Sequence, residues 1–264
     1  MGIGDIDWQQ PWLLPLRDTG VVLAASEDWI AAANLLATAG ELRNLGEQPI
    51  VFVPQQDLPA DTGYEAHIAA TGQVPTRDNL HDFFNALIWL HFPHTKRQLN
   101  GLHAKSLMQP ARPGTRGSQR DAATLFDENA ALFVSTDTGT LDALRRRDWK
   151  DVLLKQPADF AAGAQALLFG HALLEKLVAP YKSITAHVWT CHVDADWLVL
   201  PFRERLAALD RRIAQAIRTG FSSADFCHLP VLGVPGWWRG QDEGFYDDAD
   251  VFRPVRAKAI RAVQ

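Results

Sequence analysis

The chain has 264 residues, of which 47% are hydrophobic and 22% are charged, a composition that is ordinary for a globular protein and sufficient for a large buried core. Its net charge of −5 at pH 7 does not favour nucleic acid or an anionic membrane as a partner. The sequence begins with neither a basic segment nor an apolar run, and no stretch is apolar enough to span a bilayer. Cys191 and Cys227 are too few for a disulfide framework, so we expect a cytoplasmic protein with reduced thiols.

Hydrophobic periodicity and turn residues predict the elements of the first third of the chain. A short apolar run that ends at a serine predicts a buried strand, and a helical pattern that ends at a glycine follows it. A second strand lies between prolines, and a short helix and a loop come after it. The predicted ranges are 20–26 (strand), 27–46 (helix), 48–55 (strand), 63–72 (helix) and 73–79 (loop).

Two consecutive helices are predicted in the middle of the chain. The pattern is helical from Asn79 to Phe92. Pro93 then starts a second helix, because proline is tolerated in the first helical turn and not in the interior. This second helix is expected to end near Leu107, and the following segment, 108–123, is rich in Pro, Gly and Arg, which indicates a basic loop.

The last part of the chain mixes strands and helices and ends in an irregular aromatic segment. The predicted ranges are 130–135 (strand), 140–156 and 159–179 (helices), 184–201 (one or two strands) and 202–220 (amphipathic helix). From about residue 228 we expect an irregular segment that wraps the surface to bury its rings. No linker divides the chain. The prediction is therefore one α+β domain over 1–264, predominantly helical, with a small sheet.

The segment 81–103 carries polar side chains at helical spacing inside an apolar stretch. On the first helix they fall on one face together with Trp89, and on the second helix they again share one face. These polar residues are His81, Asp82, Asn85, Lys96, Asn100 and His103. Each residue taken singly is more often a helix cap or part of a solvated face. As a set interleaved with aromatic residues they predict the wall of a pocket, if the break at Pro93 folds the two helices together.

Two further groups of residues could contribute to such a pocket. Arg112, Arg116 and Arg120 lie on or after the basic loop, where guanidinium groups can bind a phosphate or a carboxylate, and where surface pairs with acidic residues are the alternative. His171 and Glu175 are spaced i, i+4, which suits two metal ligands or a carboxylate that orients an imidazole. A satisfied histidine–glutamate pair in the core is the competing interpretation.

Several motifs resemble those of one protein family. "YEAHI", "VPTRDNLHDFFNALIWLHFPHTKRQLNGLH", "RDAATLFDEN", "FGHALLEKLVAPY" and "LPVLGVPGWW" resemble, in this order, the bacterial domain of unknown function 3025 family, from about Asp7 to about Trp238. The resemblance implies a bacterial, cytoplasmic protein with one family-length domain, and it implies no particular reaction. One departure is Ala130, where the family pattern leads us to expect glycine and a local turn.

The first functional hypothesis is a hydrolase of the phosphoester class, acting on a small phosphorylated or nucleotide-like compound. Imidazoles and carboxylates can exchange protons near neutral pH or hold a divalent metal ion that activates water. The residues assigned to catalysis are His81, Asp82, His103, Asp121 and Asp127. The residues assigned to the small anionic ligand are Asn85, Trp89, Lys96, Asn100, Arg116 and Arg120. The residues assigned to a divalent metal ion are His171 and Glu175, and Trp237 and Trp238 are expected to cover the mouth.

Two alternatives remain open at this point. A metal-dependent phosphohydrolase of the His-Asp type would use His67, the adjacent His81–Asp82 pair and Asp127. A non-catalytic protein would use the same pocket to bind a small ligand, or the basic loop to contact a protein or nucleic acid. The chain contains no G-x-S-x-G nucleophile motif and no glycine-rich phosphate loop. Nothing in the sequence specifies the substrate or the oligomeric state.

Overall fold

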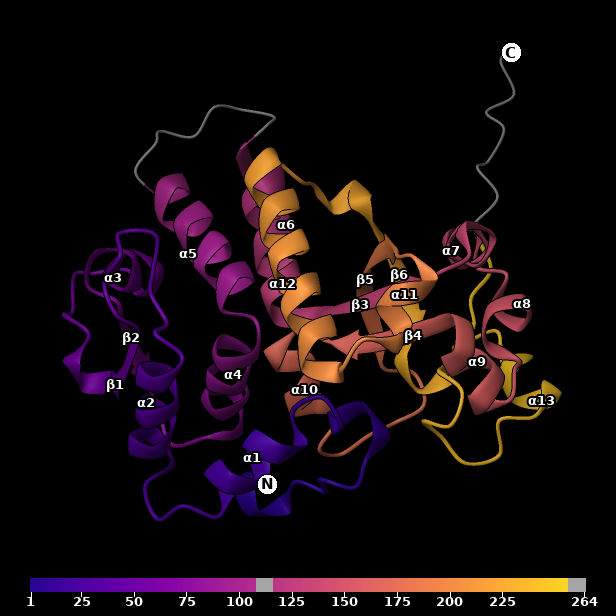
Figure 1. Ribbon diagram of the computed structural model, residues 1–264, viewed down its shortest axis with the longest axis horizontal. Helices are drawn as coiled ribbons and strands as arrows, with labels where there is room; N and C mark the ends of the chain where they lie inside the picture. Colours follow the sequence, from indigo (N-terminus) through magenta and orange to yellow (C-terminus); the bar gives the residue numbers. More distant parts are fainter. Residues whose placement is uncertain (108–115, 256–264) are drawn as a thin grey trace.

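The α+β prediction is confirmed by the computed structural model, which describes residues 1–107 and 116–255 (Figure 1). The strands form two sheets rather than one. The α-helices are α1 (Arg17–Ala24), α2 (Trp29–Ala39), α3 (Tyr64–Thr71), α4 (Leu80–His91), α5 (Pro93–Leu107), α6 (Arg116–Asn129), α7 (Thr138–Arg146), α8 (Trp149–Leu153), α9 (Pro157–Gly163), α10 (His171–Lys176), α11 (Ala195–Val199), α12 (Phe202–Thr219) and α13 (Glu243–Tyr246). The short 3-10 helices are η1 (Ile3–Asp5), η2 (Pro11–Leu13), η3 (Gln55–Asp57), η4 (Ser223–Asp225) and η5 (Val231–Gly233).

The smaller sheet is a pair of parallel strands joined by α3. β1 (Val51–Pro54) and β2 (Gln73–Thr76) pair in parallel, so part of the predicted loop 73–79 is a strand. The side chain of Asn34, on α2, supports β1 by donating to the carbonyl of Phe52 at 2.8 Å and accepting from its N–H at 2.7 Å. An amide side chain thus supplies the pairing that a third strand would give to this edge of the sheet.

The larger sheet has the strand order β4-β3-β5-β6. β3 (Ala130–Ser135) pairs in parallel with β5 (Thr185–His192), and it pairs antiparallel with β4 (Ala164–Leu168). β6 (Phe226–Pro230) pairs antiparallel with β5 at the other edge. Every residue of β3 is buried, as expected for a central strand that is covered on both faces. Ala130 begins this strand with a negative φ, so no turn at this position requires glycine.

The predicted pair of helices in 79–107 is confirmed. The side chain of Asn79 accepts a hydrogen bond from the N–H of Asp82 at 2.8 Å and so caps α4. Phe92 ends α4, and Pro93 is the first residue of α5. In Figure 1, α5, α6 and α12 stand side by side, and α4 lies beneath α5.

The start of α5 is fixed by a carboxylate from α12. Asp210 is 1% exposed and accepts hydrogen bonds from the N–H of His94 at 2.9 Å and of Thr95 at 2.8 Å. The first backbone N–H groups of a helix have no partner within the helix, so Asp210 satisfies two of them inside the core. This contact holds α5 and α12 together.

Several segments differ from the predicted elements. Of the predicted basic loop 108–123, residues 108–115 lie outside the described residues and 116–123 lie in α6. The helix predicted for 140–156 is divided into α7 and α8, and the second half of 184–201 contains the helix α11 rather than a strand. Residues 20–26 lie mostly in α1, because an apolar run of this length suits a half-buried helix as well as a strand. The helix predicted for 27–46 ends at Ala39, and the one predicted for 159–179 is interrupted by β4. The tail from about residue 228 begins within β6 and includes α13, although much of it is irregular.

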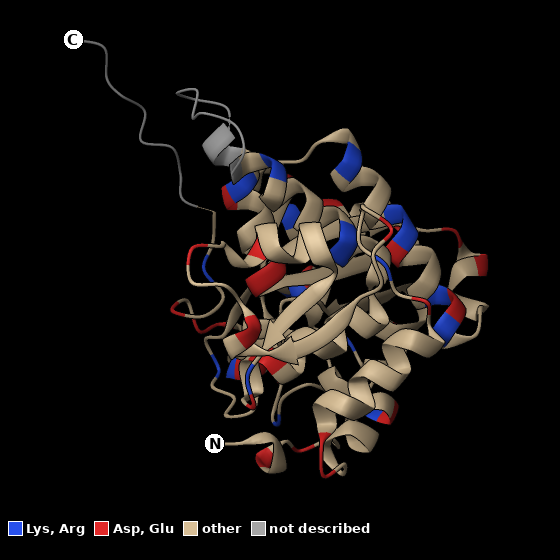
Figure 2. Cartoon of the chain, turned by 90° about the vertical axis from the view of Figure 1, so that its left-hand side faces the viewer, with Lys and Arg blue, Asp and Glu red and all other residues tan. Residues whose placement is uncertain are grey.

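The surface carries both signs of charge. In the view of Figure 2, lysine and arginine residues are interspersed with aspartate and glutamate residues. In the part of the chain that the structure describes, no helix has the length and apolar character needed to cross a membrane.

The first prediction concerns the carboxylate that caps α5. Asp210→Ala removes the cap and leaves two buried N–H groups without acceptors, so the free energy of unfolding should fall by about 2–3 kcal/mol. Asp210→Asn should lose less, because the amide oxygen still accepts. Urea unfolding measures both. Glu204→Ala, an exposed position on the same helix, is the control and should change stability by less than about 0.5 kcal/mol. An equal free energy of unfolding for Asp210→Ala and the control would show that the cap contributes nothing to stability.

Candidate functional site

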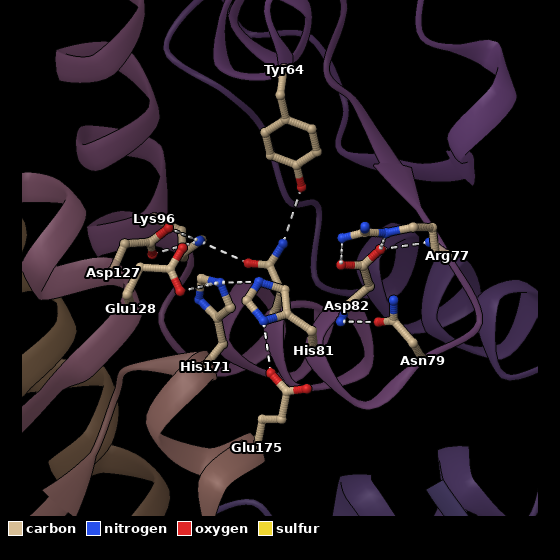
Figure 3. Close-up of polar contacts among 11 residues, drawn as sticks. Tyr64, Arg77, Asn79, His81, Asp82, Lys96, Asp127, Glu128, His171 and Glu175 are labelled. Atoms are coloured by element: carbon tan, nitrogen blue, oxygen red, sulfur yellow. Dashed lines mark hydrogen bonds and ion pairs between the residues drawn. The ribbon is translucent and has the colours of Figure 1, made fainter. Parts of the chain in front are cut away.

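A pocket of about 440 Å³ lies where α3, α4, α6 and α10 meet (Figure 3). Both the predicted helices and segments far from them in the sequence contribute to its walls. The lining residues are Gln55, Leu58, Tyr64, Glu65, Arg77, His81, Asp82, Asn85, Asp127, Glu128 and His171. It is a polar cavity, unlike the apolar pockets that bind most uncharged ligands.

Two imidazoles face each other in this pocket. The Nε2 atoms of His81, on α4, and His171, on α10, are 3.1 Å apart, and the rings meet edge to face. The other ring nitrogen of His81, Nδ1, lies 2.9 Å from a carboxylate oxygen of Glu175. Because a carboxylate can only accept at neutral pH, Nδ1 of His81 carries the proton, and its Nε2 is left with a lone pair directed at His171.

Glu128 completes a group of three possible metal ligands. Its Oε2 atom is 3.5 Å from Nε2 of His171, and one ligand atom each from His81, Glu128 and His171 lie within 4.8 Å of one another. Burial and the neighbouring Asp127 charge raise the pKa of Glu128 above its ordinary value. Among the residues that the structure describes, this is the one such cluster of histidine, cysteine and acidic side chains.

Close backbone packing brings Glu128 and His171 together. Gly170 caps α10, and a Cβ atom at this position would lie 2.5 Å from the carbonyl oxygen of Glu128 and from the N atom of Ala130. Only glycine permits this approach. The rings of Phe126 and Phe169, each buried, have centroids 4.8 Å apart. This contact packs the segment that carries Glu128 against the segment that carries His171.

A buried ion pair lies beside the imidazoles. Nζ of Lys96 is 2.6 Å and 2.9 Å from the two carboxylate oxygens of Asp127, and both residues are buried. Burial most strongly opposes the ionisation of Asp127, but the charge and hydrogen bond of Lys96 together with the neighbouring His171 and His103 outweigh it, and the pKa of Asp127 lies below its ordinary value. Lys96 also donates to Asn85 at 2.9 Å. The polar faces of α4 and α5 therefore do meet across the break at Pro93.

Asn85 connects the ion pair to a tyrosine on α3. Its Nδ2 atom donates to the hydroxyl oxygen of Tyr64 at 3.1 Å. Burial, followed by the charges of Glu65 and Asp82, raises the pKa of Tyr64, so the phenol is neutral at physiological pH. With its oxygen accepting from Asn85, the phenol can donate its own proton to a ligand in the pocket.

Asp82 is held by an arginine from the end of β2. The guanidinium of Arg77 binds both oxygens of Asp82, at 2.9 Å and 3.0 Å, and the backbone N–H of Arg77 donates to the same carboxylate at 2.7 Å. This bidentate pair fixes Asp82 and removes it from the set of free catalytic bases.

The lining of the pocket is acidic. Glu65, Asp82, Asp127 and Glu128 contribute four carboxylates and Arg77 one guanidinium, which gives a formal charge of −3 with both histidines neutral. Lys96 and Glu175, just outside the lining, carry opposite charges and leave this value unchanged. A cation is therefore attracted to the pocket, and an anion alone is repelled.

The structure brings together only some of the residues assigned from the sequence. His81, Asp82, Asn85, Asp127 and His171 line the pocket, with Lys96 and Glu175 directly behind it. The buried residues Trp89 and His103 and the exposed residues Arg120 and Asp121 do not line it. Asn100 also lies outside and binds Glu65 through its side-chain nitrogen, at 2.7 Å from the carboxylate and 2.9 Å from the carbonyl.

Other sequence assignments are not part of this pocket. Glu175 does not pair with His171 as the i, i+4 spacing suggested, because its carboxylate binds His81 instead. His67 is buried outside the lining, and Asp82 is held by Arg77, so the His-Asp arrangement is not formed. Trp237 packs against Trp12, and neither Trp237 nor Trp238 lines the pocket. Arg112 and the side chain of Arg116 lie outside the described residues.

Sequence reasoning did not assign six residues of the lining, among them Gln55 and Leu58 at and after η3. Tyr64 and Glu65 begin α3, Arg77 follows β2, and Glu128 comes directly after Asp127. The sequence does offer a signal for Glu128, since it directly follows Asp127 in the same acidic segment. For Arg77 and Tyr64 no local pattern distinguishes them from surface residues.

The structure shows an α+β fold with a pocket lined by histidine and carboxylate side chains. Comparison with known proteins gives the family of the chain. The family described as "Protein of unknown function (DUF3025)" matches residues 50–256. The chain belongs to this family, and the matched segment contains every residue of the pocket. Comparison with curated proteins found no match, and comparison with solved structures found none either.

The second prediction concerns the buried ion pair. Asp127→Ala leaves the ammonium of Lys96 buried without a counter-charge, so the free energy of unfolding should fall by about 3–5 kcal/mol. The double variant Lys96→Met with Asp127→Leu removes both charges and should recover most of this loss. Urea unfolding in EDTA measures both variants. A double variant as unstable as Asp127→Ala would show that the cost does not come from the unpaired charge.

The third prediction concerns the metal-free protein at acid pH. Burial lowers the pKa of His171 to about 4, whereas an unfolded histidine titrates near 6.5. As the pH falls from about 6.5 to 4, the unfolded chain binds a proton that the folded chain does not, and stability should fall by up to roughly 3 kcal/mol. Unfolding in EDTA at several pH values measures this loss, which should be smaller in His171→Gln. An identical pH profile for wild type and variant would contradict it.

Proposed function

We propose that this protein is a divalent-metal-dependent hydrolase of a small substrate with an anionic group, of the phosphoester class. The observation that carries the proposal is the convergence of His81, His171 and Glu128 at one point in the pocket. Hydrolysis is favoured over simple binding because a polar cavity adjoins these three side chains and a neutral phenol and an arginine lie in its walls.

Two of the three separations between the ligand atoms fit a small metal ion, and the third, between His81 and Glu128, is within 4.8 Å. Ligands of tetrahedral zinc lie about 2.0–2.1 Å from the ion, which puts neighbouring ligand atoms about 3.3 Å apart. The two Nε2 atoms are 3.1 Å apart, and Oε2 of Glu128 is 3.5 Å from Nε2 of His171. Two histidines and one glutamate are also a donor set of catalytic zinc sites, in which a fourth position holds water.

The surroundings keep His171 neutral and hold His81 in the tautomer that can bind a metal ion through Nε2. A ligating histidine must be neutral, and the burial of His171 keeps it so at pH 7. His81 has its proton on Nδ1 because of Glu175, so its Nε2 is ready to bind. A carboxylate that accepts from the distal nitrogen in this way orients the ring and increases its basicity.

The negative charge of the pocket requires a metal ion to bind before an anionic substrate. Lys96 is neutralised by Asp127, and Arg77 by Asp82, so neither supplies a free positive charge for a phosphate. Arg120, which was expected to contribute one, is exposed outside the lining. A divalent cation must therefore enter first and provide the positive charge that an anionic substrate needs.

A bound divalent ion would supply the nucleophile by lowering the pKa of a coordinated water towards neutrality. Hydrolysis forms a bond between the water oxygen and phosphorus, breaks the bond between phosphorus and the leaving oxygen, and transfers one proton of the water to that leaving oxygen. The hydroxyl of Tyr64, held by Asn85, can donate to an oxygen of the substrate. The exposed side of Arg77 can contact the substrate's outer part.

The first test is metal binding, which is the fourth prediction. Titration of EDTA-treated protein with Zn²⁺ and Co²⁺ should show one site, and His81→Ala, His171→Ala and Glu128→Gln should each weaken it at least 100-fold. Glu175→Gln should weaken it by about 10–100-fold, as expected for a residue that only orients a ligand. His192→Gln, at an exposed histidine, is the matched control and should bind as wild type does. Failure of the wild type to bind any of Zn²⁺, Co²⁺ and Mn²⁺ would overturn the proposal.

The second test is turnover. The Zn²⁺-, Co²⁺- or Mn²⁺-loaded protein should hydrolyse p-nitrophenyl phosphate or bis-p-nitrophenyl phosphate, and His81→Ala should abolish this activity. Because the side chain of His81 is 32% exposed, the melting temperature of His81→Ala in EDTA should stay close to that of the wild type. A protein that binds metal at this site but hydrolyses neither ester would refute the phosphoester part of the proposal and favour a metal-binding or sensing role.

A further inference from the structure

A second, larger hollow shares no lining residue with the metal pocket. It has a volume of about 970 Å³ and lies between strands β5 and β6, the junction of α7 and α8, and the segment 250–255. In Figure 1, α7 and α8 lie at the far side of the larger sheet from α3 and α5. Its size is in the range of pockets that bind nucleotide-sized molecules.

Arg147, at the edge of this hollow, has a backbone conformation that is unusual for its residue type. It follows α7 with φ 61° and ψ 36°, in the left-handed region. Its N–H bonds to Ala143 and Leu144, and the N–H of Asp148 donates to Ala143 at 2.9 Å, which is the helix-ending motif where glycine is preferred. A strained residue that directs a charged group into a hollow is a feature of binding sites.

The polar groups of Arg147 are only partly satisfied. Its Nη2 atom is 3.3 Å from Nδ1 of His228, and its Nη1 atom is 3.4 Å from the carbonyl oxygen of Pro254. Since a guanidinium only donates, Nδ1 of His228 must accept, and the proton of this neutral ring is on Nε2. Within the described part of the chain, Arg147 has no carboxylate in salt-bridge distance.

A second arginine and a second histidine face the same hollow. Arg253 is exposed, its Nε atom donates to the carbonyl of Asp250 at 2.9 Å, and among the described residues it too forms no ion pair. His187 pairs with His228 across β5 and β6, with ring centroids 5.0 Å apart. Burial lowers the pKa of both histidines, with a further contribution from Arg147 at His228 and from the neighbouring ring of His228 at His187, so both rings are neutral at pH 7.

The lining is positive, in contrast to the metal pocket. The charged groups of the lining are the two guanidinium groups of Arg147 and Arg253 and the single carboxylate of Asp250. Ser183 and Thr185 also line the hollow; the hydroxyl of Thr185 donates to the carbonyl of Ser183 at 3.1 Å, and the hydroxyl of Ser183 can donate a hydrogen bond to an oxyanion.

We propose that this hollow is a binding site for a small organic phosphate, whose phosphate group is held by Arg147 and Arg253. Guanidinium groups bind phosphate through two parallel hydrogen bonds, and Nε2–H of His228 provides a further donor. The volume beyond the arginines accommodates the organic part of the ligand, along the β5–β6 face. The proposal is independent of the metal pocket and of the reaction proposed there.

The probes are AMP and inorganic phosphate, titrated by calorimetry in EDTA at low and moderate salt. We expect AMP to bind the wild type more tightly than inorganic phosphate does, because only AMP fills the hollow beyond the arginines. Arg147→Gln and Arg253→Gln should each weaken AMP binding at least 10-fold. Arg146→Gln removes the same charge from the neighbouring residue, which lies outside the hollow, and should bind within twofold of wild type.

Arg147→Gly, the fifth prediction, separates binding from folding. Glycine relieves the left-handed backbone, so the melting temperature should rise by roughly 2–4 °C while AMP binding is lost. A purely structural arginine would give a lower melting temperature on replacement. No binding of either probe to the wild type at millimolar concentration, or equal losses in Arg146→Gln and Arg147→Gln, would overturn the proposal. Equal affinity for AMP and inorganic phosphate would restrict the site to a simple anion and refute the organic ligand.

Discussion

A lysine ammonium buried in a protein needs a negative partner. The pair formed by Lys96 and Asp127 therefore constrains the packing of the helices that line the pocket. Lys96 is on α5 and Asp127 is on α6, so the charge pair fixes how these helices pack. Asn85, which accepts from the same ammonium, ties α4 to them. Glu128 is the next residue after Asp127, so the pair also helps to position the carboxylate that lies 3.5 Å from His171. An electrostatic requirement of the core thus determines the geometry of the site.

The sequence was sufficient to predict the helical part of the site. Spacing placed Asn85 and Lys96 on faces that meet across Pro93, and the structure shows their hydrogen bond at 2.9 Å. It also assigned His81, through the polar face of 81–103, and His171, through its i, i+4 spacing with Glu175, to a pocket, and the structure places both in the same lining. Such inferences succeed where the contacts follow from the 3.6-residue repeat of one or two consecutive helices.

Residues brought in by long-range packing were not predictable in this way. Glu128 meets His171 only because Gly170 allows two backbones to touch, and no periodicity reports such a contact. Likewise, Glu175 was assigned to its helical neighbour His171, whereas tertiary packing gave it to His81. The strand β4 was taken for helix because a short apolar run between helices has no period that distinguishes the two.

The two-stranded sheet has a consequence for access to the metal pocket. A pair of strands alone is marginally stable, yet this pair and its connecting helix α3 supply Tyr64, Glu65 and Arg77 to one wall. The opposite wall, on α6 and α10, rests on the four-stranded sheet and its aromatic core. We therefore expect local unfolding to begin on the β1–α3–β2 side, where amide hydrogens should exchange ahead of those in β3. Ligand entry would then require local unfolding of this wall alone, while α4, α6 and α10, which carry His81, Glu128 and His171, stay folded.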